Sequence, residues 1–81
     1  MMEIKVYTRP NCQPCKATKK KLDQLGAVYT LVDVTEDAEA RDAIRALGYK
    51  QAPVVVAGDQ HWSGFSPDNL KWAAAVQRGV A

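Results

Sequence analysis

Apolar and polar residues alternate at the start of the chain. Ile4 and Val6 are separated by Lys5 and followed by Tyr7, so one face of this segment is apolar. An alternation with a period of two residues is typical of a strand with one buried face. The pattern therefore predicts a strand over Glu3–Thr8.

From Cys12 onwards the inward-facing positions recur at helical spacing instead. One face of this segment carries residues three or four positions apart, namely Cys15, Thr18, Leu22 and Leu25. This spacing places the side chains on one side of a helix. We therefore expect a helix from Cys12 to about Leu25, ended by Gly26, with Cys15 facing inward.

A second strand and a second helix are expected next. Val28–Val34 is a nearly continuous run of branched and aromatic residues, which is typical of a strand buried on both faces. Thr35 is a favourable N-cap, and the acidic residues after it suit the positive end of a helix dipole. The helix is expected to end at Gly48. The side chains expected to face inward from it are Ala40, Ile44 and Leu47.

The remainder of the chain predicts a hairpin and a third helix. Pro53–Ala57 and Gln60–Trp62 are the expected strands, joined by a Gly-Asp turn. Ser66 is a favourable N-cap, and Pro67 suits the first helical position of a helix that runs to about Ala75. Gly79 lies beyond its end.

The expected order of elements is β-α-β-α-β-β-α. Its strand–helix–strand start implies a right-handed parallel crossover, and its late hairpin adds antiparallel strands. We therefore predict an α/β fold with a four-stranded mixed sheet flanked by three helices. The 81 residues suffice for one small core, so we expect a single domain over residues 1–81.

Composition narrows the classes of protein. With 47% hydrophobic and 25% charged residues, the chain is typical of a folded globular protein rather than a disordered one. Apolar runs such as Pro53–Ala57 are far too short to span a membrane. No targeting segment precedes the first strand, and no cysteine outside one Cys-x-x-Cys could form a distant disulfide. We therefore expect a cytoplasmic protein.

The net charge of +2 gives no indication of nucleic acid binding. The basic residues are nevertheless unevenly distributed. Near the cysteines they gather at Arg9, Lys16, Lys19, Lys20 and Lys21. Such a cluster is either a solvated helix face or a docking surface for an acidic partner, and the sequence leaves both interpretations open.

The chemistry is indicated by the segment Cys12-Gln13-Pro14-Cys15, which lies between a strand and a helix. Thiol–disulfide exchange requires a thiolate, and the N–H groups and dipole at a helix N-terminus stabilise that anion. Cys12 lies where these groups converge, so we assign it as the attacking nucleophile. Cys15 lies one turn further along, is expected to be less exposed, and is assigned as the resolving thiol.

Metal binding is the main alternative for a cysteine pair. A closed zinc site requires four ligands, usually from two such pairs. This chain has one pair and a single histidine, His61, beyond the hairpin turn. We therefore expect no metal and no cofactor.

Three segments carry a family resemblance: Thr8-Arg9-Pro10-Asn11-Cys12-Gln13-Pro14-Cys15, Gln51-Ala52-Pro53-Val54-Val55 and Trp62-Ser63-Gly64-Phe65-Ser66-Pro67-Asp68. Together they resemble the NrdH-redoxins, which combine a glutaredoxin-like version of the thioredoxin fold with thioredoxin-like activity. The resemblance implies an electron carrier that is reduced by NADPH through thioredoxin reductase. Its expected electron acceptor is the large subunit of class Ib ribonucleotide reductase. We expect the protein to be a monomer.

The resemblance also implies site residues. Cys12 and Cys15 would carry the redox cycle, and Pro53 matches a proline that is cis in this fold. Ala52 would then pair its backbone with an extended substrate segment. The remaining residues expected to contact a substrate or partner are Arg9, Gln13, Pro14, Trp62, Ser63, Gly64 and Phe65.

Some of these assignments carry alternatives. We expect Phe65 mainly to pack, whereas the role of Trp62 stays open between core packing and partner contact. Gln13 and Pro14 stand where many relatives carry Val-Gln or Met-Gln, and Ser66 stands where many carry a basic residue. These differences from the relatives bear on the reduction potential of the cysteine pair and on the affinity of the protein for its partners.

Three other functions remain open from the sequence. A glutathione-dependent glutaredoxin is the first, although the residues that cradle glutathione in that family are mostly unmatched. The second is a module that holds an iron–sulfur cluster or a metal between two protomers. The third is a regulatory scaffold that binds a partner and oxidises as a sensor.

Overall fold

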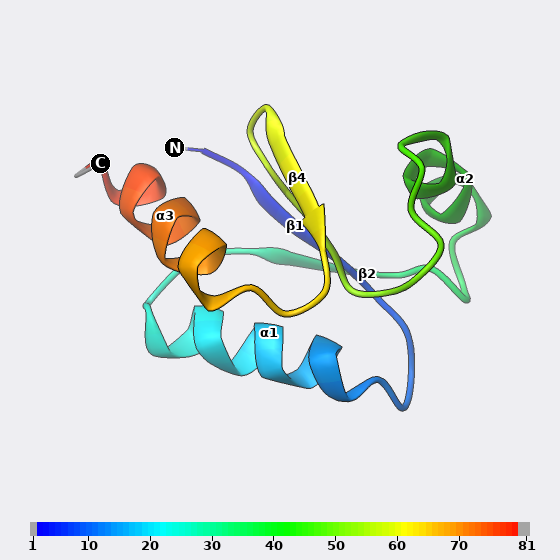
Figure 1. The fold of residues 1–81 in the computed structure, drawn as a ribbon, viewed down its shortest axis with the longest axis horizontal. Coiled ribbons are helices and arrows are strands. Elements are labelled where there is room, and N and C mark those ends of the chain that lie inside the picture. Colours follow the sequence, from blue (N-terminus) through cyan, green and yellow to red (C-terminus); the bar gives the residue numbers. More distant parts are fainter. Residues whose placement is uncertain (1, 80–81) are drawn as a thin grey trace.

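The predicted order of strands and helices is confirmed. The computed structural model describes residues 2–79. Along the chain (Figure 1), its elements are β1 (Ile4–Thr8), α1 (Gln13–Gln24), β2 (Thr30–Asp33), α2 (Ala38–Ala46), β3 (Val54–Ala57), β4 (Gln60–Ser63) and α3 (Pro67–Arg78). Cys12 is the N-cap of α1, and Leu25 is its C-cap. Gly26 follows with φ +69°, a left-handed conformation that ends the helix.

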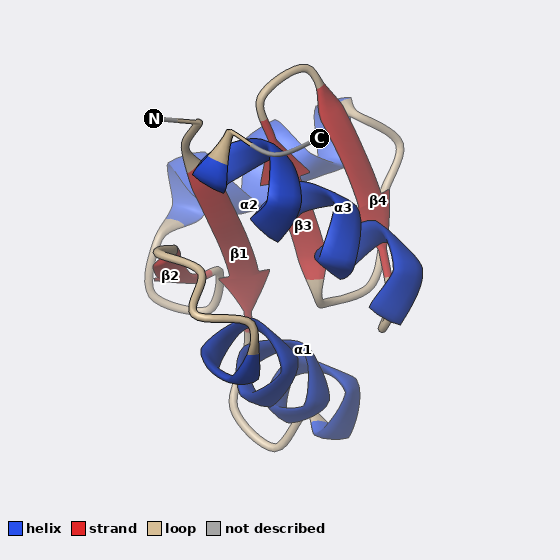
Figure 2. Ribbon diagram, turned by 90° about the vertical axis from the view of Figure 1, so that its left-hand side faces the viewer, coloured by secondary structure: helices blue, strands red, loops and turns tan. Residues whose placement is uncertain are grey.

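The four strands form one mixed sheet in the order β2-β1-β3-β4. β1 pairs with β2 in parallel and with β3 antiparallel, and β3 and β4 form the antiparallel hairpin. Helices α1 and α3 lie on one face of the sheet, whereas α2 lies behind the opposite face (Figure 2). The carboxyl end of β1 leads directly to the Cys-x-x-Cys segment, so the sheet fixes the position of the cysteines.

The hydrophobic core lies between the sheet and the helices α1 and α3. Ile4 and Val6 are almost fully buried in β1, as the alternating pattern predicts. They form one cluster with side chains of β3, α1 and α3: Val55, Ala57, Leu22, Leu70 and Ala73. This packing fixes α1, and therefore the cysteines at its start, against the sheet.

The prediction for the second strand is wrong in two respects. The strand is limited to Thr30–Asp33 rather than Val28–Val34, and it is not buried on both faces. Val28 is 60% exposed and Leu31 is 43% exposed. The reason is topological, because β2 is an edge strand and the antiparallel β3, not β2, takes the central place beside β1.

The prediction for the second helix also needs correction. Its N-cap is Asp37, whose carboxylate accepts a hydrogen bond of 3.0 Å from the N–H of Ala40. Thr35 instead lies in the preceding turn, where its N–H and hydroxyl both donate to Asp33. Ile44 is the buried side chain of α2, whereas Leu47 is 47% exposed and does not face inward. The helix ends at Ala46, so Leu47 follows its last turn as the C-cap.

The last helix begins as predicted but runs further than Ala75. Ser66 is its N-cap, although the Ser66 hydroxyl makes no capping hydrogen bond, and Pro67 opens the helix. The helix continues to Arg78 because Gln77 is buried and hydrogen-bonded within the fold. Its side-chain amide accepts from the N–H of Val28 and donates to the carbonyls of Val28 and Met2.

Within residues 2–79, none of the helices has the length and apolar character needed to cross a membrane.

Candidate functional site

Cys12 and Cys15 form a disulfide at the first turn of α1. Their Cα atoms are 5.2 Å apart, which is within the usual range for bonded cysteines. The two intervening residues, Gln13 and Pro14, are exposed at the start of the helix. At this turn it is therefore the pair of intervening residues, rather than the two sulfurs, that faces solvent.

The hydrogen bonding around the two sulfurs is asymmetric. The backbone N–H of Cys15 donates to Sγ of Cys12 over 3.2 Å, so Cys12 caps the helix with its sulfur. The same Sγ lies 3.8 Å from the carbonyl oxygen of Ala52. An N–H donor at a helix N-terminus stabilises negative charge on the atom that it contacts. This contact therefore favours developing charge on Cys12.

The expected difference in exposure between the cysteines is not present. Cys12 and Cys15 are both buried, each with 5% of its surface exposed. The disulfide holds both sulfurs in the first turn of α1, so neither side chain projects into solvent. The distinction between the two cysteines consequently lies in their hydrogen bonding rather than in their accessibility.

Two further residues shape the turn that presents Cys12. Asn11 adopts φ +58°, a left-handed conformation that asparagine tolerates better than most residues with a side chain. Thr18 is fully buried, and its hydroxyl donates to the carbonyl oxygen of Pro14 over 2.8 Å. The helical spacing predicted an inward Thr18, but neither residue was predicted to shape the site.

Pro53 lies at the start of β3, and the Ala52–Pro53 peptide bond is cis, as the resemblance implied. The Pro53 side chain is buried, whereas Ala52 is half-buried and precedes the strand pairs of β3. The carbonyl of Pro53 accepts a hydrogen bond of 2.9 Å from the N–H of Gly64. The structure thus brings Cys12, Ala52, Pro53 and Gly64 together.

The other residues of the segment after β4 have different environments. Trp62 is half-buried and packs against the core, while its indole N–H is buried with no hydrogen-bond partner among the described residues. Ser63 and Phe65 are exposed, so the expectation that Phe65 mainly packs is wrong. Phe65 follows Gly64, where the chain leaves the sheet, and 43% of its surface faces solvent.

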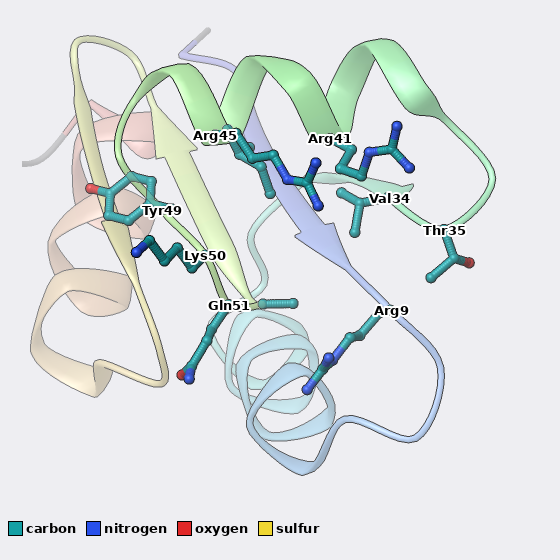
Figure 3. A pocket seen from close by; sticks show the side chains of 10 residues that line it. Arg9, Val34, Thr35, Arg41, Arg45, Tyr49, Lys50 and Gln51 are labelled. Carbon is teal, nitrogen blue, oxygen red and sulfur yellow. The ribbon is translucent and has the colours of Figure 1, made fainter.

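Arg9 lines a pocket of about 370 Å³ that extends from Ala52 towards α2 (Figure 3). Three other basic residues share this pocket, namely Arg41, Arg45 and Lys50. None of these three was singled out by the sequence reasoning. The signal was present in part, because positions 41 and 45 are one helical turn apart and share a helix face.

Metal-ligating groups do not gather anywhere in the described part of the chain. Residues 2–79 contain no group of three or more His, Cys, Asp or Glu side chains placed to hold a metal ion. His61 is exposed, and its Nδ1 is hydrogen-bonded to the hydroxyl of Tyr49 at 2.7 Å.

A Cys-x-x-Cys disulfide at the N-terminus of the helix after β1, beside a cis-proline, defines a dithiol–disulfide oxidoreductase with a thioredoxin-type fold. Comparisons with known proteins refine this class. The glutaredoxin family model matches residues 4–62. The glutaredoxin-like protein NrdH of Salmonella typhimurium is 48% identical over 69 residues, and that of Escherichia coli K12 is 46% identical. Each of these alignments covers 85% of both chains.

A solved structure agrees with this result. The NrdH-redoxin of Escherichia coli superposes with a TM-score of 0.85 at 44% identity, covering 88% of this chain and 93% of the other. The chain belongs to the glutaredoxin family, within its group of glutaredoxin-like NrdH-redoxins.

Proposed function

We propose that the protein is a cytoplasmic electron carrier that reduces protein disulfides through Cys12 and Cys15. Its electrons come from NADPH through thioredoxin reductase, and its main acceptor is class Ib ribonucleotide reductase. The observation that supports the redox role is the contact of Cys12 Sγ with the N–H of Cys15 at the start of α1. The choice of partners is supported by the relatives, one of which is described by its thioredoxin-like activity profile.

The reaction follows from the positions of the two sulfurs. In the reduced protein, the Cys12 thiolate attacks one sulfur of a client disulfide, forms a mixed disulfide and releases the other client sulfur as a thiolate. The Cys15 thiolate then attacks Sγ of Cys12, which restores the internal disulfide and releases the second client sulfur. Two electrons pass to the client, and each client thiolate takes up one proton.

The client is held by its backbone in this proposal. Ala52 precedes the first residue of β3, and its carbonyl oxygen lies 3.8 Å from Sγ of Cys12. An extended client segment that pairs with Ala52 would therefore place its own cysteine beside Cys12. The side chains of Gln13, Pro14, Ser63 and Phe65 are exposed around this position and would meet the flanking client residues.

The source of electrons is tested by reconstituting the two reducing systems separately. Insulin disulfide reduction is followed with NADPH and thioredoxin reductase in one assay, and with NADPH, glutathione and glutathione reductase in the other. We expect turnover in the first assay and little in the second. Turnover with the glutathione system alone would instead identify a glutathione-dependent glutaredoxin.

The roles of the cysteines are tested by serine substitutions. Cys12→Ser should abolish turnover, because the attacking sulfur is lost. Cys15→Ser should accumulate a mixed disulfide between Cys12 and the client, detected as a covalent complex on non-reducing gels. Full activity in both variants would contradict this proposal and would favour a binding or sensing role.

The proposed acceptor requires its own assay. Deoxyribonucleotide formation by a class Ib ribonucleotide reductase is measured with NADPH, thioredoxin reductase and either the wild-type protein or Cys12→Ser. We expect product formation to depend on the wild-type protein and on its concentration. If the reductase turns over equally with Cys12→Ser, the protein is not its electron donor.

A further inference from the structure

The pocket beside Ala52 is lined by four cationic side chains. Its cationic side chains come from three segments, namely the β1–α1 connection, α2 and the chain before β3 (Figure 3). These side chains are Arg9, Arg41, Arg45 and Lys50. The described residues that line the pocket include no aspartate or glutamate. Four positive charges around about 370 Å³ repel one another, and a bound anion relieves this repulsion.

The cations of this pocket are mostly without ion pairs inside the fold. Within residues 2–79, the ion pairs closer than 4.0 Å join Lys5 to Glu3 and Arg41 to Asp42. The second pair is exposed and joins neighbouring residues over 3.7 Å. Arg9, Arg45 and Lys50 form no such pair in the described part of the chain, so their charges remain available to a ligand.

The position of the pocket connects it to the redox site. Ala52 belongs to the pocket lining, and its carbonyl oxygen lies 3.8 Å from Sγ of Cys12. A client segment that pairs with Ala52 would therefore continue past the cations. Because Ala52 itself lines the pocket, client residues that flank the reactive cysteine on this side can reach the cations.

We propose that this pocket binds aspartate or glutamate side chains that flank the reactive cysteine of an extended protein client. The inference rests on the proposed function and adds a preference for acidic clients to it. Arginine matches the geometry of a carboxylate with two parallel N–H donors, which suits Arg9 and Arg45. A protein segment fits better than a small amino-acid derivative, because the lining has no acidic side chain to pair with a free ammonium group.

The test compares disulfide peptides that differ only in the residues beside the cysteines. These residues are glutamate in one peptide, glutamine in a second and lysine in a third, on both sides of the disulfide. The fully reduced protein is mixed with each peptide, and the second-order rate constant of reduction is measured. Thioredoxin reductase is omitted, so the result does not depend on the source of electrons.

The expected result is a ratio of rate constants. The acidic peptide should react about fivefold to tenfold faster than the glutamine peptide, as expected for two partly exposed ion pairs. In Arg45→Gln combined with Lys50→Gln, this ratio should fall close to one. In Arg45→Glu combined with Lys50→Glu, the lysine peptide should become the preferred substrate.

A matched control separates the pocket from the total charge of the protein. Lys71→Gln combined with Arg78→Gln removes the same charge from exposed positions of α3 outside the pocket, and should keep the wild-type ratio. About 1 M salt, where the Debye length is about 3 Å, should reduce the preference for the acidic peptide.

The outcomes distinguish this inference from the proposed function. If the wild type reduces none of the peptides, the proposed disulfide reduction itself is wrong. Equal rates for all three peptides overturn the acidic preference alone. Oxidised glutathione is assayed as a fourth substrate. If only its rate depends on Arg45 and Lys50, the pocket serves a small thiol and the inference is overturned.

Discussion

At the scale of single residues, Asn11 controls how the chain enters the redox segment. Its φ of +58° turns the backbone so that Cys12 can take the extended N-cap conformation. We expect Asn11→Gly to preserve activity and stability, because glycine adopts this conformation freely. Asn11→Val should cost about 1–2 kcal/mol of unfolding free energy in urea and slow disulfide reduction. Equal rates and stabilities for the two variants would show that the turn does not depend on Asn11.

Gln77 is a second single residue that we expect to contribute strongly to the stability of the fold. Its buried amide makes three hydrogen bonds, to the backbone of Val28 and Met2. Gln77→Leu keeps a similar volume but removes all three, and should lower the unfolding free energy by about 2–3 kcal/mol in urea titrations. Gln24→Leu is the matched control at an exposed position of α1, and should change it by less than about 0.5 kcal/mol. Similar losses in both variants would contradict this role.

At the scale of elements, we expect the stability of the turn between β2 and α2 to depend on the charge of Asp33. Asp33 accepts hydrogen bonds from the hydroxyl and the N–H of Thr35, at 2.6 and 2.8 Å. These bonds hold the pKa of Asp33 below its ordinary value of 3.8. A pKa lowered by folding stabilises the native state above pH 3.8, and this contribution is lost as the pH falls through the folded pKa.

Thr35→Val tests this linkage by removing the hydroxyl donor. We expect the pKa of Asp33 in the folded variant to rise towards 3.8, as measured by NMR titration of its carboxyl carbon. Between about pH 5 and pH 2, the unfolding free energy of the variant should also fall less than that of the wild type, because this is the acid range in which such a carboxylate is protonated. Thr30→Val, in the exposed part of β2, is the control. An unchanged Asp33 titration would exclude the hydroxyl as a cause.

The same elements show what the sequence can and cannot predict. Local patterns identify β1 and α1, because Ile4, Val6 and Leu22 are buried at the expected spacing. Burial of Val28–Val34 was overestimated because an apolar run does not reveal that its strand lies at the edge of the sheet. Thr35 and Asp37 are both acceptable N-caps, and only the turn through Asp33 decides between them.

The site was predictable to a similar extent. The Cys-x-x-Cys is read directly from the sequence, and the cis-proline follows from the family resemblance; each appears at its expected place in the fold. Arg45 and Lys50 join Arg9 only through the packing of α2 beside Ala52, which residue spacing does not encode. Phe65 was misjudged because aromatic residues usually pack, whereas the chain leaves the sheet at Gly64 and exposes it.

At the scale of the whole molecule, stability should be distributed unevenly between the two faces of the sheet. The core cluster joins the sheet to α1 and α3, whereas α2 contributes Ile44 as its buried side chain. Helices with few buried apolar contacts open locally at a lower free energy than the whole domain. We therefore expect the amides of α2 to exchange with solvent faster than those of α1 and α3 in native-state hydrogen exchange.

Two variants and one ligand test this expected difference in hydrogen-exchange protection between α2 and the other two helices. Leu70→Ala should lower the protection of α1, α3 and the central strands together, because it creates a cavity in the shared core and costs about 2–5 kcal/mol. Ile44→Ala should lower the protection of α2 alone. Since α2 carries Arg41 and Arg45, binding of the acidic peptide should raise its protection by linkage. Equal protection of all three helices would show that α2 belongs to the cooperative core.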